Sequence, residues 1–172
     1  MERMKKILLE RERAGTLRAL EPLIRHGRGW VRLLDSEDKL LDFSSNDYLA
    51  LSEHPEVIGA SRKYLEMFGA GAGAARLMSG DLEINHLLEQ EIAGLKSREA
   101  ALTFGSGYLA NIGIIPALAG RGDLIITDRL SHASIYDGCL LSGAMTIRFR
   151  HNDLAHLEQI LQEKRSQFNG CL

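Results

Sequence analysis

The arrangement of apolar residues in the C-terminal part of the chain constrains its fold most. Between residues 100 and 164, short apolar runs alternate three times with longer runs whose apolar residues recur at helical spacing. The short runs are 100–104, 123–127 and 144–149, and the helical runs are 107–118, 134–141 and 153–164. Such an alternation of strands with helices predicts an α/β fold, in which helices cover a mostly parallel sheet.

The residues before this alternation have a different pattern. Residues 3–20 are rich in charge and predict a surface helix or arm, and residues 30–43 predict a short hairpin. Helices are predicted over 55–68, which begins with a proline and stops at a glycine, and over about 81–95. The intervening segment 69–75 reads GAGAGAA and predicts a loop.

Composition and charge exclude several classes of protein. The chain has 21 basic and 23 acidic residues and a net charge of −2, so we expect neither nucleic acid nor a membrane surface as a partner. The longest mainly apolar stretch, 108–120, is too short to span a bilayer, and the charged N-terminus lacks the apolar core of a signal peptide. Cys139 and Cys171 form no disulfide framework, which favours a cytoplasmic protein, and the scattered histidines predict no metal site.

The turn Gly105-Ser106-Gly107-Tyr108 is the first candidate for chemistry. It follows the first predicted strand and opens the next predicted helix, at the edge of the sheet where α/β folds place their ligands. Glycines allow the backbone to approach an anion, and the free N–H groups of a helix start point at it. The turn therefore predicts a phosphate site, although glycines also occur in such turns for their tight geometry alone.

The identity of the phosphate compound stays open at this point. Gly105, Gly107 and Ala110, with Asp128 at the end of the next strand, fit the fingerprint of a dinucleotide-binding unit. Against this reading, that unit usually opens its fold, whereas about 100 residues precede it here.

Two residues near the turn, His132 and Tyr108, have both a functional and a purely structural interpretation. His132 follows the second predicted strand, where an imidazole can stack on a flat cofactor, exchange protons with a substrate, or simply stand beside a helix cap. A capping box of Ser134 and Asp137 is predicted to open that helix. Tyr108 can stack on an aromatic ring or pack on the sheet edge.

Three residues further upstream are weaker candidates. Asn46 lies in SSNDYL, where an Asn-Asp pair is ordinary turn chemistry. Arg18 and Arg76 have planar guanidinium groups that can clamp a carboxylate, but each can equally be a solvated charge.

Six segments taken together are far more specific than any one of them. They are LDFSSNDYLALSEHPEVI, the glycine-rich loop ending in RLMSG, His86-x-x-Leu88-Glu89, FGSGYLAN, DRLSHASIYDG and FRHND, in this order. From about Arg18 to Leu161 the chain resembles the α-oxoamine synthase family of pyridoxal-phosphate enzymes. SSNDYL and GSGYLAN favour the member of the biotin pathway over the glycine C-acetyltransferase and 5-aminolevulinate synthase types.

The resemblance implies a fold and a reaction. The fold is that of a fold-type I, aspartate-aminotransferase-like enzyme, a homodimer with its site at the subunit boundary. The cofactor is pyridoxal 5'-phosphate, and the reaction condenses L-alanine with a pimeloyl thioester (pimeloyl-CoA or pimeloyl-carrier protein), with loss of carbon dioxide, to 8-amino-7-oxononanoate. Residues 1–45 would form an N-terminal arm and part of the small domain, and residues 46–172 the first part of the large cofactor-binding domain.

The resemblance also implies roles for single residues. Gly107 and Tyr108 match the turn that holds the cofactor phosphate. His132 matches the histidine that stacks on the pyridine ring and helps with substrate protons. Asn46 matches a position near the amino-acid substrate, and Arg18 an arginine in the acyl-substrate site.

Other parts of the family pattern are absent from the sequence. None of the lysines lies in a segment that resembles the Schiff-base motif; they are Lys5, Lys6, Lys39, Lys63, Lys96 and Lys164. The sequence ends in SQFNGCL, where we expect no further strand to continue the sheet. We therefore expect an N-terminal fragment with an incomplete sheet that is inactive alone; a non-catalytic dimerisation partner is the alternative.

Overall fold

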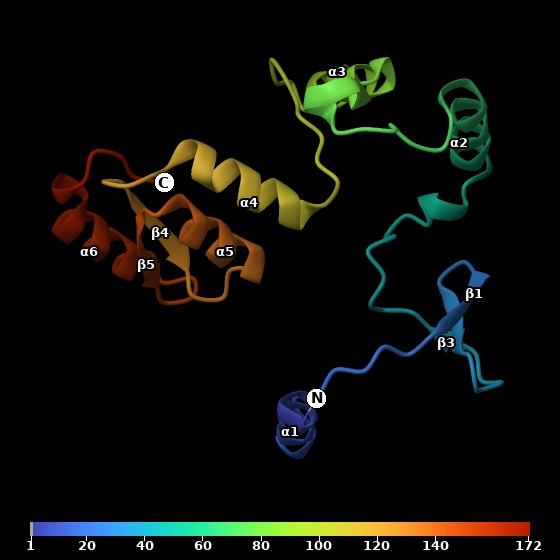
Figure 1. Ribbon diagram of the computed structural model, residues 1–172, viewed down its shortest axis with the longest axis horizontal. Helices are drawn as coiled ribbons and strands as arrows, with labels where there is room; N and C mark the ends of the chain where they lie inside the picture. The colour runs from blue at the N-terminus through green and yellow to red at the C-terminus, as the bar shows by residue number, and fades with distance from the viewer. Residues whose placement is uncertain (1) are drawn as a thin grey trace. The chain divides into compact units, whose positions relative to one another are not determined.

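The computed structural model describes residues 2–172, which form two compact units that meet in sequence at Ala74 and Ala75 (Figure 1). In the part described, no helix has the length and apolar character needed to cross a membrane.

The unit up to Ala74 contains a small antiparallel sheet and two longer helices. Its elements are α1 (Glu2–Arg13), β1 (Leu23–Gly27), β2 (Trp30–Leu33), β3 (Leu40–Leu41), the 3-10 turn η1 (Leu51–Glu53) and α2 (Pro55–Phe68). The strands are ordered β1-β2-β3, so the hairpin predicted over 30–43 is confirmed. Strand β1 was not predicted, because its sequence LIRHG has only two apolar residues and no alternation.

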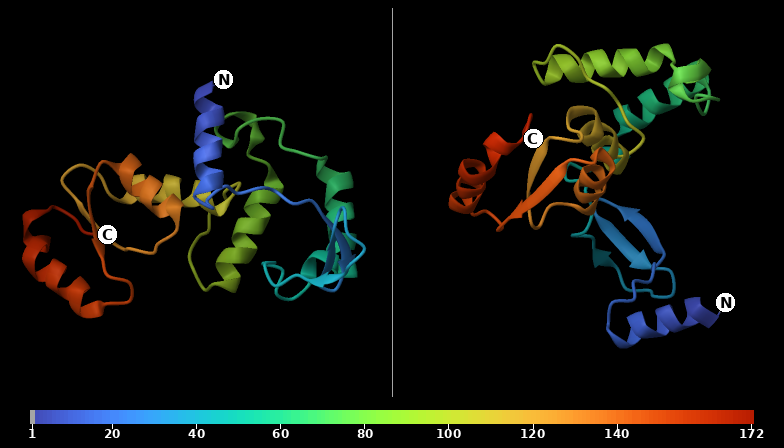
Figure 2. Two further views of the ribbon diagram at one scale, coloured as in Figure 1. Left: turned by 90° about the horizontal axis from the view of Figure 1, so that it is seen from below. Right: turned by 60° about the vertical axis from the view of Figure 1, so that its left-hand side comes forward.

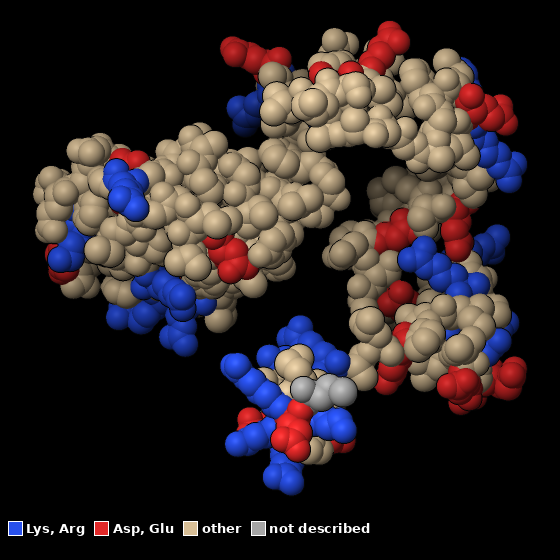
Figure 3. Space-filling view, in the orientation of Figure 1, with Lys and Arg blue, Asp and Glu red and all other residues tan. Residues whose placement is uncertain are grey.

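Both predicted helices of this unit are present, although the first, predicted within 3–20, ends at Arg13. No residue of α1 is buried, and Figure 3 shows basic and acidic side chains all over it, as expected of a surface arm. Helix α2 begins at Pro55 and ends at Gly69, whose φ of +82° places it in a backbone region that favours glycine.

The unit from Ala75 onward is the α/β part of the chain. Its elements are the π-turn η2 (Arg76–Gly80), α3 (Glu83–Leu95), α4 (Gly107–Leu118), β4 (Leu124–Asp128), α5 (Ala133–Ser142), β5 (Met145–Phe149), α6 (Leu154–Lys164) and the 3-10 turn η3 (Arg165–Gln167). Strands β4 and β5 pair in parallel, with Leu124 opposite Met145 and Asp128 opposite Phe149. The parallel α/β pattern predicted for this region is thus confirmed.

One prediction about the sheet, the strand over 100–104, was wrong. Residues 100–104 form no strand in the described chain, because an apolar run alone supplies no neighbour for its backbone hydrogen bonds. In the described part of the chain no strand follows β5, as expected, but the C-terminal residues form an isolated parallel bridge with β4. The N–H of Leu172 donates to the carbonyl of Leu124 at 2.9 Å, and the N–H of Ile126 to the carbonyl of Leu172 at 2.9 Å. Strand β4 is therefore hydrogen-bonded along both of its edges.

Helices α4 and α5 pack side by side with unusually close backbones (Figures 1 and 2). A Cβ atom on Gly138 of α5 would lie 2.8 Å from the carbonyl oxygen of Asn111 of α4. The buried residues Ala119, Ile125 and Cys139 form the core that joins the two helices to β4. The absence of a side chain at Gly138 therefore sets the distance between the two helices.

We expect the substitution Gly138→Ala to lower the free energy of unfolding by about 1–3 kcal/mol, because its methyl group meets a backbone atom that cannot turn aside. Gly94→Ala in α3 is the control, since its Cβ would meet nothing within 4 Å. The control should be neutral or stabilising by up to about 1 kcal/mol. Urea unfolding of both variants checks this, and equal stabilities would contradict the close contact.

Candidate functional site

The first turn of α4 is an open backbone site. Ser106 is the N-cap, and its Oγ accepts a hydrogen bond from the N–H of Leu109 at 3.1 Å. The N–H groups of Gly107 and Tyr108 have no acceptor among residues 2–172. A Cβ on Gly107 would meet nothing within 4 Å. Two free donors at a helix start, with open space before them, fit an anion such as a phosphate.

The side chain of Tyr108 is held beside this turn by helix α5. Its hydroxyl donates to the carboxylate of Asp137 at 2.8 Å, and this bond to an anionic group raises the pKa of Tyr108. Asp137 is thus engaged with α4. The capping box predicted for Ser134 and Asp137 was wrong, because the helix begins one residue earlier and is capped by His132.

The ring of His132 is anchored on one side and exposed on the other. Its Nδ1 atom lies 2.6 Å from Oγ of Ser134 and accepts the backbone N–H of Ser134 at 3.2 Å. The Ser134 hydroxyl in turn accepts a hydrogen bond from the side-chain amide of Asn111 at 2.8 Å. Asn111 lies one turn after the open site of α4, so this chain of contacts connects the site to the histidine.

Sequence reasoning singled out His132 and the glycine turn but missed Asn111 and the role of the Ser134 side chain. The only signal was a polar residue in the otherwise apolar stretch of α4. Asn111 is half-buried and Ser134 is 1% exposed. A polar residue away from solvent needs a hydrogen-bond partner, and this requirement could have identified Asn111 and Ser134 as a pair.

Asp128 does not have the free carboxylate that a dinucleotide site needs. Its oxygens accept the N–H of Leu130 at 2.7 Å and that of Asn152 at 3.0 Å, and the ring of His151 lies 3.0 Å away. These hydrogen bonds, the one from Leu130 first, lower the pKa of Asp128. The carboxylate fastens the loops that follow β4 and β5, and the geometry gives the dinucleotide interpretation no support.

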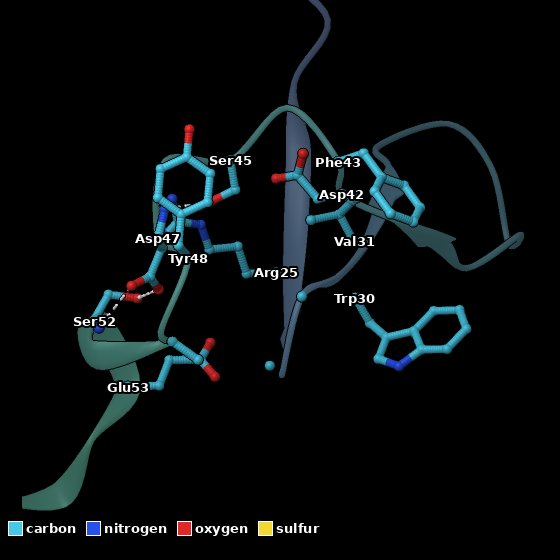
Figure 4. Close-up of a pocket in the computed structure, with 13 residues that line it drawn as sticks. Arg25, Trp30, Val31, Asp42, Phe43, Ser45, Asp47, Tyr48, Ser52 and Glu53 are labelled. Atoms are coloured by element: carbon cyan, nitrogen blue, oxygen red, sulfur yellow. Dashed lines mark hydrogen bonds between the residues drawn. The ribbon is translucent and has the colours of Figure 1, made fainter.

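Asn46 and Arg18 belong to the other unit, and both side chains are exposed there. Asn46 lies between β3 and η1, and its chain neighbours Ser45 and Asp47 line a cavity of about 280 Å³ (Figure 4). The cavity is also lined by Arg25, Trp30, Phe43, Tyr48 and Glu53. Two of the acidic groups there are already paired within this unit. Asp47 accepts the N–H of Ser52 at 3.3 Å, and Glu53 accepts the N–H of Arg28 at 3.0 Å.

Comparison with known proteins identifies the family. The model of the family "Aminotransferase class I and II" matches residues 38–171. The chain belongs to this family.

Individual relatives in this family are closely similar. The chain is 51% identical over 159 residues to 8-amino-7-oxononanoate synthase of Methylobacterium nodulans, covering 92% of this chain and 41% of that protein. It is 54% identical over 134 residues to the protein of the same name from Geotalea daltonii, covering 78% of this chain and 34% of that one. The chain thus spans about a third to two fifths of the length of the curated relatives it matches.

Solved structures confirm the fold class. Serine palmitoyltransferase of Sphingomonas wittichii aligns with a TM-score of 0.85 and 31% identity, over 98% of this chain and 43% of that one. 8-Amino-7-oxononanoate synthase of Francisella tularensis aligns with a TM-score of 0.61 and 32% identity, over 72% of this chain and 34% of that one. The prediction of an aspartate-aminotransferase-like α/β fold, present in part, is therefore confirmed.

In this member of the aminotransferase family, Arg76 is a structural anchor. Its guanidinium pairs with both oxygens of Glu89 on α3 and with Asp81. Glu89 also accepts the N–H of Thr103 at 2.8 Å, just before the open turn of α4. The Arg76 guanidinium, which could have bound a substrate carboxylate, is thus already paired with two carboxylates of its own unit. The network fastens the segment that leads into the site.

The carboxylate of Glu89 should make the stability of the fold depend on pH in the acid range. The guanidinium of Arg76 and then the N–H of Thr103 lower its pKa from 4.5 to about 2. A lowered pKa in the folded state means that the contribution is complete above about pH 4.5 and is lost as the pH falls towards 2.

We therefore expect Glu89→Gln to reduce stability at neutral pH and to flatten the decline of stability between about pH 4.5 and 2. Glu91→Gln, at an exposed position of the same helix, is the control. The unfolding midpoint measured against pH checks this. Parallel curves for the wild type and Glu89→Gln would show that Glu89 does not carry the effect.

Proposed function

We propose that the complete protein carrying this sequence is a pyridoxal-phosphate-dependent C-acyltransferase of biotin biosynthesis. It condenses L-alanine with pimeloyl-CoA or pimeloyl-carrier protein, with loss of carbon dioxide, to 8-amino-7-oxononanoate. The observation that carries the proposal is about 50% identity to relatives named 8-amino-7-oxononanoate synthase. The open turn of α4 supports it independently, because it offers the anion site that such an enzyme needs.

The cofactor would be held at the first turn of α4. A structure of SPT with PLP aligns with this chain at a TM-score of 0.82 and 29% identity, over 94% of it. In this chain the free N–H groups of Gly107 and Tyr108 would bind the cofactor phosphate, and the exposed ring of His132 would stack on its pyridine ring. When bound, pyridoxal phosphate supplies the electron sink for removing a proton and carbon dioxide from the substrates.

Two residues upstream of Ala75 would contact the substrates. We assign Asn46 to the amino-acid substrate and Arg18 to the acyl substrate, on the family motifs alone. Residues 1–45 would be an arm and part of a small domain, and residues 46–172 the first part of the large domain. The protein would be a cytoplasmic homodimer whose partners are small molecules, with no role for nucleic acid or membrane.

The lysine that binds the cofactor covalently would lie outside these 172 residues. The relatives are more than twice as long as the part that this chain matches. None of the lysines of this chain lies in a Schiff-base motif. We therefore do not expect the 172-residue chain to turn over by itself.

The two free N–H groups make a specific prediction for phosphate binding. Gly107→Pro removes one donor at the first helical position, where proline is well tolerated, and Gly107→Ala retains it. Loss of a hydrogen bond to a charged group should weaken binding of pyridoxal 5'-phosphate by about 10- to 100-fold. Binding of pyridoxal, which lacks the phosphate, should change little.

Spectroscopic titration of the complete protein with both compounds checks this prediction. Gly107→Ala should bind pyridoxal 5'-phosphate more tightly than Gly107→Pro. Equal losses for pyridoxal and for its phosphate in Gly107→Pro would contradict a phosphate contact at this turn.

The reaction is tested with the complete protein loaded with pyridoxal phosphate. We expect its visible absorbance to shift on addition of L-alanine, and carbon dioxide to be released once pimeloyl-CoA is added. A response to glycine with an acetyl donor, and none to L-alanine, would instead indicate the glycine C-acetyltransferase type. If no small amino acid altered the spectrum, the proposal would be wrong.

A further inference from the structure

The contacts of His132 determine which ring nitrogen carries the proton in the neutral form. The backbone N–H of Ser134 can only donate, and it lies 3.2 Å from Nδ1 of the ring. This long contact favours a lone pair on Nδ1. A neutral imidazole that accepts at Nδ1 carries its hydrogen on Nε2.

The side-chain hydroxyl of Ser134 strengthens this assignment. It accepts from the amide nitrogen of Asn111 at 2.8 Å, so its own hydrogen is free to point at Nδ1 of His132, 2.6 Å away. Because Ser134 is 1% exposed, water does not compete for these positions. Asn111 thereby fixes the direction of the hydrogen bonds, from α4 through the buried serine to the ring.

We propose that Asn111 and Ser134 are positioning residues that hold His132 as its Nε2–H tautomer. They also tie the ring to α4, the helix that opens with the free N–H groups of Gly107 and Tyr108. Proton exchange with a substrate can then occur only at Nε2, because two donors occupy Nδ1. The catalytic meaning of this arrangement rests on the proposed function, whereas the tautomer itself does not.

The tautomer can be measured directly by nitrogen NMR of the complete protein labelled with [15N]histidine, without cofactor or substrate. The His132 signals are assigned by their loss in His132→Gln. At a pH where the ring is neutral, the wild type should show a bare Nδ1 and a protonated Nε2. A wild-type ring with its proton on Nδ1 would overturn the proposal, whatever the protein turns out to bind.

Two substitutions test the positioning residues. Asn111→Asp keeps the shape but replaces the donor by an acceptor. The Ser134 hydroxyl should then donate to the new carboxylate and leave the backbone N–H of Ser134 as the one remaining donor to Nδ1, which should give a mixture of tautomers. Ser134→Ala removes the hydroxyl and should leave a mixture of tautomers. Ser131→Ala is the control, because Ser131 precedes His132 directly but bonds to Thr127 at 2.9 Å.

The control should retain the wild-type spectrum. If Asn111→Asp and Ser134→Ala also retained it, the proposal would be overturned. Should Ser134→Ala fail to fold, the nearly isosteric Asn111→Asp decides the matter. In the loaded enzyme we expect Asn111→Asp to lower kcat with L-alanine by about tenfold or more, while the affinity for pyridoxal phosphate changes little. A purely structural role would instead lower the affinity and the melting temperature together.

Discussion

The close contact between α4 and α5 at Gly138 is the constraint on which the candidate site depends. With no side chain at Gly138, the backbone of Asn111 can approach α5 closely. At that distance the Asn111 amide reaches Ser134, and the Tyr108 hydroxyl reaches Asp137. A wider spacing would break both bonds and detach His132 from the helix that carries the open turn.

A second set of contacts fixes the turn from the other side. The residues before it, 100–104, form no strand, so sheet hydrogen bonds do not hold them. Glu89 replaces those bonds by accepting the N–H of Thr103 while it pairs with Arg76. The turn therefore lies between two fixed parts of the chain. The segment before it is held by the charged pair of Glu89 and Arg76, and helix α4 after it is held by its close packing on α5. Both anchors lie outside the turn, which leaves its donors available.

The sequence predicted what depends on local patterns. The limits of α2 and α4 agree with the prediction, because proline, glycine and apolar spacing act within a few residues. The predictions that failed concern residues whose hydrogen-bond partners lie elsewhere in the sequence. Asp137 has a suitable place in a capping box, yet its carboxylate meets Tyr108, 29 positions earlier. Arg76 pairs with Asp81, five residues later, and also with Glu89 on the following helix. The family motifs could point to His132, but only coordinates reveal what holds its ring.

The central claim is that a cofactor phosphate binds at the first turn of α4, with the ring of His132 against the cofactor. The most direct measurement is a crystal structure of the complete protein with pyridoxal 5'-phosphate. We expect phosphate oxygens at about 3 Å from the N–H groups of Gly107 and Tyr108. The pyridine ring should lie against His132, whose Nδ1 remains on Ser134. A phosphate bound elsewhere, with this turn empty, would contradict the account.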